Sequence, residues 1–402
     1  AILPAVLLSD GPCVIENLPD ISDVSTILKT MQSLGAQIRM INKSTVEIDP
    51  RHVNSFVVSK KMAEGMRASS YFLGALLGRM LRARVAPPGG CDFGVRPIDQ
   101  HIKGFEALGA KMTIENGMVD AKAMSLTGCL IYLDVVSVGA TINIMLAAAK
   151  ADGLTIIENA AREPHIVDLA NFLNSMGANI MGAGTGVIKI RGVKHLSGAD
   201  YSIIPDQIEA GTYMAAAVAT RGDILVTNVT PKHLESIIAK LRETGAEITE
   251  FDESVRVKMT RRPRKCNVKT MPHPGFPTDM QPQIAAVLSI ADGTSIITEG
   301  VWDSRFRYVE QLTFMGADIQ VDGKMAVITG VEKLKPSPVR AVDLRAGAAM
   351  IIAGLSAEGT TEIEEIDHID RGYENVVEKF SALGADIKRV KTFDNFQALK
   401  QA

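Results

Sequence analysis

The chain has 402 residues, 43 of them Lys or Arg and 46 Asp or Glu, which gives a net charge of −3. This length predicts two or three domains, and 46% hydrophobic and 22% charged residues are typical of globular proteins. The near balance of charge excludes a broad basic field for nucleic acid or an anionic membrane. No apolar run approaches the roughly 18 residues that would span a bilayer.

Four cysteines occur, and none are paired at the CxxC spacing of zinc ribbons or redox dithiols. So few cysteines in a chain of this length predict a reducing compartment, the cytoplasm. They are Cys13, Cys91, Cys129 and Cys266.

A short pattern, apolar-x-Gly-Ala-x-apolar or a close variant, recurs six times at nearly regular intervals along the whole chain. Its glycines are Gly35, Gly109, Gly177, Gly245, Gly316 and Gly384. Such regularity indicates a true internal repeat. Before the first glycine, Ile27, Leu28, Met31 and Leu34 have helical spacing, so each glycine is predicted to end a helix in a left-handed C-cap before a strand.

A second glycine lies upstream of the first, at a nearly constant offset, in five of the units. These glycines are Gly11, Gly153, Gly222, Gly293 and Gly359. Four of them follow an Ala-rich helical stretch and precede a strand-like stretch. Each unit therefore reads helix, strand, loop, helix, strand, strand, which predicts an α/β fold. Six units predict two domains of three units, residues 1–204 and 205–402, facing each other across a cleft.

Polar groups recur where the Ala-rich helices begin, at one fixed offset before the upstream glycine. These places hold Gly139, just after Ser137, Ile208, between Asp206 and Glu209, and then Asp279 and Arg345, and the matching place in the second unit is near Arg67. Helix N-termini favour anions, although ordinary N-capping is the alternative interpretation for any one of them. Differing residues at equivalent positions favour a shared ligand site.

Arginines recur in a similar way at the second helix. Arg96 precedes Gly109 by the same offset at which Arg371 precedes Gly384. Since arginine matches carboxylate and phosphate geometry, these two and Arg345 could converge on a small anion. The alternative is three weak surface ion pairs.

The second unit departs from the pattern, because a Pro- and Gly-rich stretch, residues 84–97, stands where other units have a strand. We expect this stretch to be an exposed loop. Cys91 lies on it near arginine, and positive charge favours the thiolate, so a functional role is predicted. The other three cysteines are predicted to be structural.

Asp279 follows a run of prolines that would hold its carboxylate rigidly. A positioned carboxylate is a candidate general base, and an N-capping aspartate is the alternative. The basic run 261–265 is interpreted as a solvated turn. His101 is either a core-edge histidine or a ligand contact.

Seven motifs together resemble the enolpyruvyl transferase family over nearly the whole chain. They are MRAS (66–69), PGGC with GxRPxDxH (88–101), SVGAT (137–141), PDxIExGT (205–212), PHPxFPTDMQ (272–281), DLRA (343–346) and HIDRGYE (368–374). The resemblance implies two inverse α/β barrels, each with pseudo-threefold symmetry.

The resemblance also implies a reaction. The enolpyruvyl group of phosphoenolpyruvate would move to the 3′-hydroxyl of UDP-N-acetylglucosamine with release of phosphate, the first committed step of peptidoglycan synthesis, with no cofactor. Two alternatives stay open: 5-enolpyruvylshikimate-3-phosphate synthase, and a non-catalytic nucleotide-sugar binding or regulatory paralogue.

By the same resemblance, Cys91 would be the proton donor, or a residue that mainly aids product release, and the target of fosfomycin. Asp279 would be the base on the sugar hydroxyl. Arg96, Arg345 and Arg371 would bind phosphoenolpyruvate. The expected contacts of UDP-N-acetylglucosamine are Arg67, Arg96, Pro97, Ile98, Asp99, Gln100, Val135, Val136, Ser137, Val138, Asp279 and Val301.

Two departures from the family concern the start of the sequence. A Lys-Asn pair that family members carry before the Ala-x-Leu-Pro segment is not in the sequence, which begins with that segment at Ala1. The stretch from Pro4 to Pro12 is also about one helical turn shorter. We expect that the sequence as given is truncated, rather than that the protein is a degraded copy of a family member, because the other motifs are intact.

Overall fold

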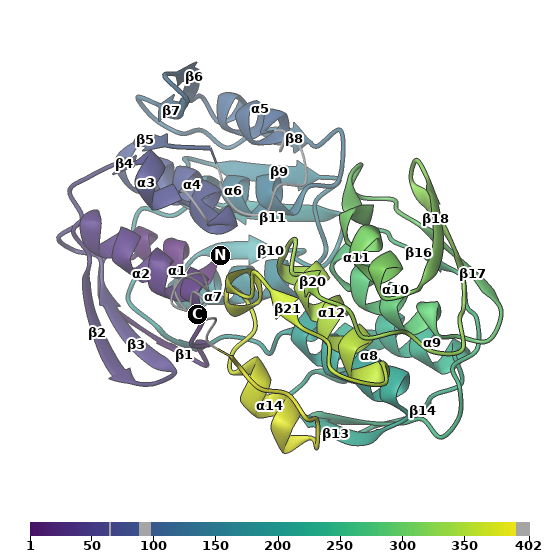
Figure 1. The fold of residues 1–402 in the computed structure, drawn as a ribbon. Helices are drawn as coiled ribbons and strands as arrows, with labels where there is room; N and C mark the ends of the chain where they lie inside the picture. Colours follow the sequence, from purple (N-terminus) through teal and green to yellow (C-terminus); the bar gives the residue numbers. More distant parts are fainter. Residues whose placement is uncertain (64–65, 88–97, 391–402) are drawn as a thin grey trace, which may run out of the picture.

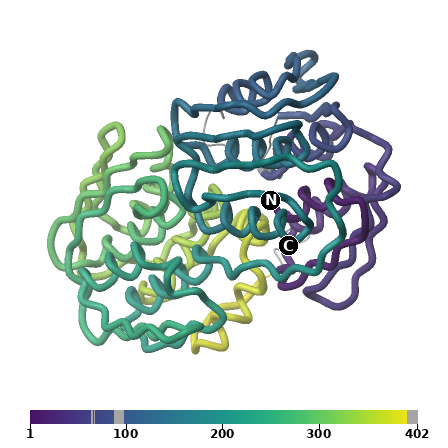
Figure 2. The backbone as a smooth tube through the Cα atoms, turned by 180° about the vertical axis from the view of Figure 1, so that it is seen from behind, coloured from purple at the N-terminus to yellow at the C-terminus, as the bar shows by residue number. Residues whose placement is uncertain are grey.

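The computed structural model describes residues 1–63, 66–87 and 98–390. Helices and small sheets alternate along the chain (Figure 1). The buried apolar residues form two clusters, one from Ile2 to Leu196 and the other from Ile208 to Phe380. Figure 2 shows the two halves of the chain as lobes lying side by side. The domain boundary between residues 204 and 205 stays a prediction.

Three four-stranded sheets belong to the first half. In order across each sheet, they are β12 (Asp200–Ser202), β1 (Cys13–Glu16), β3 (Thr45–Asp49) and β2 (Gln37–Asn42); β4 (Val57–Val58), β5 (Arg82–Val85), β7 (Met118–Lys122) and β6 (Lys111–Glu115); and β10 (Asn179–Met181), β11 (Val187–Arg191), β9 (Leu154–Glu158) and β8 (Leu130–Tyr132). Each sheet combines three antiparallel strands with one parallel edge strand, as where Leu130 of β8 lies opposite Ile156 of β9.

The second half repeats this plan with sheets of three, four and two strands. They are β13 (Asp223–Thr227), β15 (Ser254–Lys258) and β14 (Glu247–Glu250); β16 (Val268–Lys269), β17 (Thr294–Thr298), β19 (Met325–Thr329) and β18 (Asp318–Asp322); and β20 (Val339–Arg340) with β21 (Ile363–Glu364).

The sheets lie outside and the Ala-rich helices inside. β11 buries Ile188 and Ile190 between exposed neighbours, the alternation of a sheet with one solvated face. By contrast, α6 (Val138–Ala148) is buried at every residue from Ala140 onward. The other inner helices are α4 (Tyr71–Met80), α8 (Gln207–Thr220), α10 (Gln281–Ser289) and α12 (Leu344–Ser356).

Small residues let these inner helices approach one another closely. A Cβ atom added to Gly74 of α4 would lie 2.4 Å from the carbonyl oxygen of Asn143 in α6. The Asn143 amide oxygen accepts a hydrogen bond from the Gly74 backbone N–H at 2.8 Å. The Ala- and Gly-rich composition of these helices therefore follows from their close packing.

The predicted helix ends are confirmed at all six repeat glycines, whose φ angles lie between 88° and 107°. The helices that end before them are α2 (Ser22–Ser33), α5 (Asp99–Ala107), α7 (Pro164–Ser175), α9 (Glu235–Glu243), α11 (Val309–Phe314) and α14 (Val376–Ala382). Within the described residues, no helix is long and apolar enough to cross a bilayer.

One expectation for the second unit was wrong. β5 supplies the strand that the Pro- and Gly-rich stretch was expected to replace, and it pairs with both β4 and β7. The sequence did not indicate the start of β5, because no glycine ends the preceding helix α4. Leu81 itself takes the left-handed conformation, with a φ of 55°, and the strand begins at the next residue.

Candidate active site

The carboxylate of Asp279 lies between two arginines at the start of α10. Arg345 Nη2 is 3.3 Å from Asp279 Oδ2, and Arg305 Nη2 is 3.5 Å from Asp279 Oδ1. Asp279 belongs to the short helix η4 (Thr278–Met280), which leads directly into α10. Two neighbouring positive charges favour the ionised form of this carboxylate.

Glu299 fixes the backbone around this group, although it is itself almost fully buried. Its carboxylate accepts hydrogen bonds from the Thr278 hydroxyl at 3.1 Å and from the backbone N–H groups of Val301 and Trp302 at 2.8 and 3.0 Å. Thr278 precedes Asp279, so one buried carboxylate holds both Asp279 and the predicted sugar-nucleotide contact Val301 in place.

Arg345 lies in the first turn of α12, and its side chain is 13% exposed. The Asp343 side chain caps this helix by accepting the backbone N–H groups of Arg345 and Ala346 at 2.8 and 2.9 Å. Arg345 Nη1 donates to the Tyr373 hydroxyl at 3.1 Å. Its Nε is buried and has no hydrogen-bond partner among the residues that the structure describes, which leaves a donor for an anion.

Arg305 is a member of the site that the sequence analysis missed. Its side chain is only 2% exposed, at the start of η5 (Arg305–Tyr308). The position of Arg305 relative to its repeat glycine could have indicated its role. Arg305 precedes Gly316 by nearly the same offset that singled out Arg96 and Arg371 before their own repeat glycines.

Arg371 follows α13 (Asp367–Asp370), and it contacts the other half of the molecule. Its Nε donates to Asp23 of α2 at 3.2 Å, and the backbone N–H of Asp20 donates to Glu374 at 2.8 Å. Burial raises the pKa of Asp23, while the Arg371 charge acts to lower it. The segment from Arg371 to Glu374 thus joins the two halves beside the Asp279 site.

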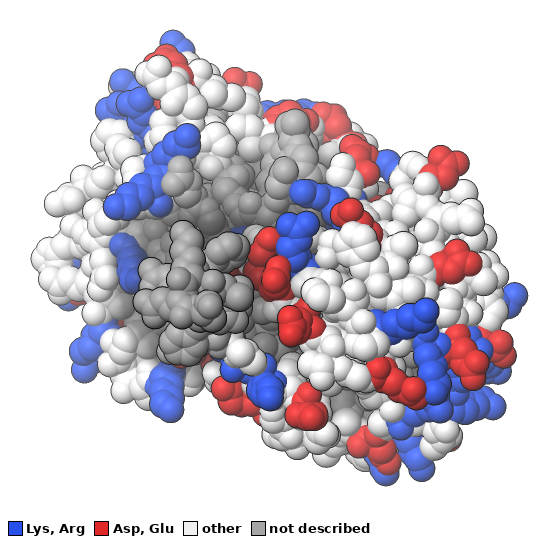
Figure 3. All heavy atoms as spheres, viewed as in Figure 1, with Lys and Arg blue, Asp and Glu red and all other residues white. Residues whose placement is uncertain are grey.

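The structure brings some predicted residues together and leaves others undescribed. Asp279 and Arg345 are in contact, and Arg371 is close in the chain to Tyr373, which binds Arg345. Cys91, Arg96 and Pro97 lie outside the described residues, as does the side chain of Arg67. Acidic and basic side chains lie side by side near the middle of the face in Figure 3.

The predicted sugar-nucleotide residues of the first half lie around the starts of α5 and α6. Val135 and Val136 are 59% and 37% exposed, so both are open to a ligand. The Ser137 hydroxyl accepts from the Ala140 backbone N–H at 3.2 Å and caps α6, ahead of Val138. Ile98 is half-buried, and Asp99 is exposed at the first position of α5.

Gln100 has a side-chain role that the sequence did not indicate. Its amide nitrogen donates to Asp99 at 2.8 Å and to Asp134 at 3.1 Å, and its oxygen accepts the Asp134 backbone N–H at 2.9 Å. Lys103 also binds Asp134, at 2.7 Å. The Gln100 side chain therefore fixes the segment that carries Val135.

His101 packs beneath the start of α6. A Cβ atom on Gly139 would lie 2.8 Å from His101 Nε2, so glycine is what makes room for the ring. Burial lowers the pKa of His101 to about 4, despite the opposing charge of Asp99. The ring is therefore neutral at pH 7.

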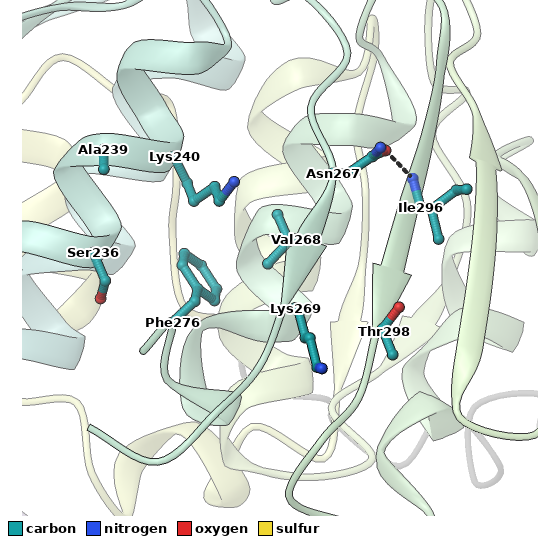
Figure 4. A pocket seen from close by; sticks show the side chains of 9 residues that line it. All are labelled: Ser236, Ala239, Lys240, Asn267, Val268, Lys269, Phe276, Ile296 and Thr298. Atoms are coloured by element: carbon teal, nitrogen blue, oxygen red, sulfur yellow. Dashed lines mark hydrogen bonds between the residues drawn. The ribbon is translucent and has the colours of Figure 1, made fainter. Parts of the chain in front are cut away.

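A pocket of about 460 Å³ lies elsewhere, between α9 and strands β16 and β17. Figure 4 shows Lys240 and Phe276 pointing into the space in front of Val268. Asp279, Arg345 and Arg371 do not line this pocket. Across residues 1–63, 66–87 and 98–390, no group of three or more His, Cys, Asp or Glu is arranged to hold a metal ion.

Comparison with known proteins identifies the family. The model of the family described as EPSP synthase (3-phosphoshikimate 1-carboxyvinyltransferase) matches residues 1–380. The chain belongs to the enolpyruvyl transferase family. Among curated enolpyruvyl transferases, UDP-N-acetylglucosamine 1-carboxyvinyltransferase 3 of Caldanaerobacter subterraneus subsp. tengcongensis is 57% identical over 97% of this chain and 94% of its own. The UDP-N-acetylglucosamine 1-carboxyvinyltransferase of Clostridium botulinum is 56% identical over the same shares.

Solved structures of enolpyruvyl transferases share the fold. NikO from Streptomyces tendae superposes with a TM-score of 0.88 at 26% identity, over 96% of this chain and 92% of its own. An EPSP synthase from Acinetobacter baumannii gives a TM-score of 0.75 at 17% identity, over 97% and 95% of the two chains. The predicted family and its α/β fold of repeated units are confirmed.

The buried His101 ring predicts a specific pH dependence of stability. Its folded pKa of about 4 lies below the unfolded value of 6.5, so the unfolded chain binds more protons between these pH values. Its contribution is complete above pH 6.5 and is lost as pH falls toward 4. Between pH 7 and 4.5, wild type should lose about 2 kcal/mol more unfolding free energy than His101→Gln.

Urea unfolding at a series of pH values measures this difference. His52→Gln, at an exposed position, is the control and should follow wild type. If the unfolding free energies of wild type and His101→Gln changed equally with pH, His101 would not titrate as described.

Proposed function

We propose that the chain transfers the enolpyruvyl group of phosphoenolpyruvate to the 3′-hydroxyl of UDP-N-acetylglucosamine and releases phosphate. The observation that carries this proposal is the set of relatives with that activity in their names, which are 50–57% identical over 97% or more of the chain. The reaction would be the first committed step of peptidoglycan synthesis, and its place would be the cytoplasm.

The chemistry is an addition followed by an elimination. C3 of phosphoenolpyruvate takes a proton, C2 becomes cation-like, and the sugar oxygen bonds to C2 as its own proton leaves. Loss of a proton from C3 and of phosphate from C2 then restores the double bond. The site must supply an acid, a base and cations for two anionic groups, and we assign no metal or organic cofactor.

Asp279 is proposed as the base on the sugar hydroxyl. Its ion pairs with Arg345 and Arg305, at 3.3 and 3.5 Å, are longer than the 2.7–2.9 Å of strong charge-assisted hydrogen bonds. An anionic substrate would compete with Asp279 for the guanidinium of Arg345. Binding of phosphoenolpyruvate would then raise the basicity of the carboxylate when a base is needed.

The remaining roles are proposals that follow the family. Arg345 would bind phosphoenolpyruvate together with Arg96 and Arg371, and the Nε donor of Arg345, unpartnered among the described residues, supports its part. Cys91 would protonate C3. The sugar nucleotide would lie against the starts of α5 and α6 in the first half and against Val301 and Asp279 in the second, in a cleft between domains 1–204 and 205–402.

The activity is tested by phosphate release from phosphoenolpyruvate. We expect release with UDP-N-acetylglucosamine as acceptor and none with shikimate 3-phosphate. Release with shikimate 3-phosphate alone would assign the chain to the other synthase. Calorimetric binding of the sugar nucleotide by folded protein, without turnover, would indicate a non-catalytic paralogue instead.

Fosfomycin should inactivate the enzyme by forming one adduct, at Cys91. Burial raises the pKa of Cys13 and Cys129, and raises that of Cys266 to about 11, which disfavours the reactive thiolate at all three. Peptide mass spectrometry locates the adduct, and Cys91→Asp should escape it. An adduct at Cys129 in place of Cys91 would contradict the assignment.

A further inference from the structure

Four polar side chains meet in the second core where α8, α10 and α12 converge. Thr212 comes from α8, Gln283 from α10, Arg345 from α12 and Tyr373 from the segment after α13. We call them the Tyr373 cluster. Tyr373 is 2% exposed, and Thr212 and Gln283 are buried as well. Buried polar groups are costly unless they are hydrogen-bonded, so the arrangement of these bonds is strongly constrained.

The donors and acceptors of the two hydroxyls in the cluster can be assigned, while the Gln283 amide oxygen is buried without a hydrogen-bond partner among the described residues. The Thr212 hydroxyl donates to the Ile208 carbonyl at 2.8 Å. The Gln283 amide nitrogen donates to the Thr212 and Tyr373 oxygens, at 3.1 and 3.3 Å, and Arg345 Nη1 donates to the Tyr373 oxygen at 3.1 Å.

A hydroxyl group has one donor and two acceptor positions. The Tyr373 oxygen already accepts from Gln283 and Arg345, and the Thr212 hydrogen is taken by Ile208. The phenol must therefore donate to Thr212, 2.9 Å away. Every position on both hydroxyls is then occupied, so the lone pair of Tyr373 that faces Arg345 has a single fixed direction.

Tyr373 also contacts Arg345 through its ring. Arg345 Cζ lies 5.4 Å from the ring centroid, within the range of a cation–π interaction. Burial raises the pKa of Tyr373, so the phenol stays protonated and keeps its donor for Thr212. Ring and hydroxyl together set the plane of the guanidinium, with Nη2 toward Asp279 and Nε available for a ligand.

The backbone beside Tyr373 lies close to the start of α12. A Cβ atom on Gly372 would lie 2.9 Å from Leu344 Cδ2, so glycine lets this segment lie against the start of α12. Gly372 separates Tyr373 from Arg371, which binds Asp23 in the other half. Tyr373 therefore links the orientation of Arg345 to the segment that joins the two halves.

We infer that Tyr373 is a positioning residue for enolpyruvyl transfer, whose hydroxyl holds Arg345 in the orientation that binds the anionic groups of phosphoenolpyruvate beside Asp279. This inference rests on the proposed function. Positioning groups of this kind act through geometry, and small displacements of a binding group cost affinity and rate.

Tyr373→Phe tests the inference, because it removes the hydroxyl and keeps the ring. We expect KM for phosphoenolpyruvate to rise about tenfold and kcat to fall severalfold, with KM for UDP-N-acetylglucosamine within about twofold of wild type. The matched control is Tyr213→Phe in α8, whose buried hydroxyl has no hydrogen-bond partner in the described part of the chain. Its kinetic constants should equal those of wild type.

A second variant tests the network itself. Thr212→Val removes the acceptor of the phenol proton, so it should raise KM for phosphoenolpyruvate in the same direction. Because both changes break one network, the double variant should resemble Tyr373→Phe rather than the product of the two effects.

Wild-type constants for Tyr373→Phe, with an active parent enzyme, would overturn the inference. An equal rise in both KM values together with a lowered Tm would also overturn it, since that pattern reports general damage. If the parent itself releases no phosphate, the proposed function fails, and the inference falls with it.

Discussion

The burial of charge around Asp279 constrains the second half of the molecule. Two guanidinium groups, 13% and 2% exposed at Arg345 and Arg305, lie beside one carboxylate. Buried charges are costly unless they are paired and hydrogen-bonded. Asp279 pairs with both, Tyr373 binds Arg345, and Asp343 caps the helix from which Arg345 projects. Moving Asp279 would leave both guanidinium groups without this carboxylate.

The repeat explains how such a site can be assembled. Inner helices of successive units converge, and each brings its first turns to the same region. α8 contributes Thr212, α10 follows Asp279 and contributes Gln283, and α12 contributes Arg345. The units share a backbone plan while differing in side chains, so one symmetric arrangement supplies a carboxylate, a guanidinium and neutral donors.

Much of the fold could be predicted from the sequence, because its signals are local. A helix that ends at glycine in the left-handed conformation depends on a few neighbouring residues, and all six repeat glycines adopt it. The inner helix starts were predicted closely, as at Arg345, where α12 begins at the preceding Leu344. The strand β5 was missed because Leu81 takes the role that glycine has elsewhere.

The site was only partly predictable, because its contacts cross between units. The motifs indicated Asp279 and Arg345, but Arg305 reaches Asp279 from a different loop, and its distance from its repeat glycine is close to that of Arg96 and Arg371 without being equal. Tyr373 and Gln283 carry no repeat signal, since their importance comes from hydrogen-bond partners that lie far away in the chain. Gln100 was predicted as a ligand contact, and only the structure revealed that its amide binds Asp134.

The central claim is that this site protonates C3 of phosphoenolpyruvate, adds the sugar oxygen at C2 and then eliminates phosphate. The most direct measurement is mass spectrometry of the nucleotide-sugar product formed in D₂O. Because C3 is protonated from a solvent-exchangeable group and later loses a proton, we predict deuterium in the methylene of the transferred enolpyruvyl group. A product formed at the same rate with no deuterium on that carbon would contradict the account.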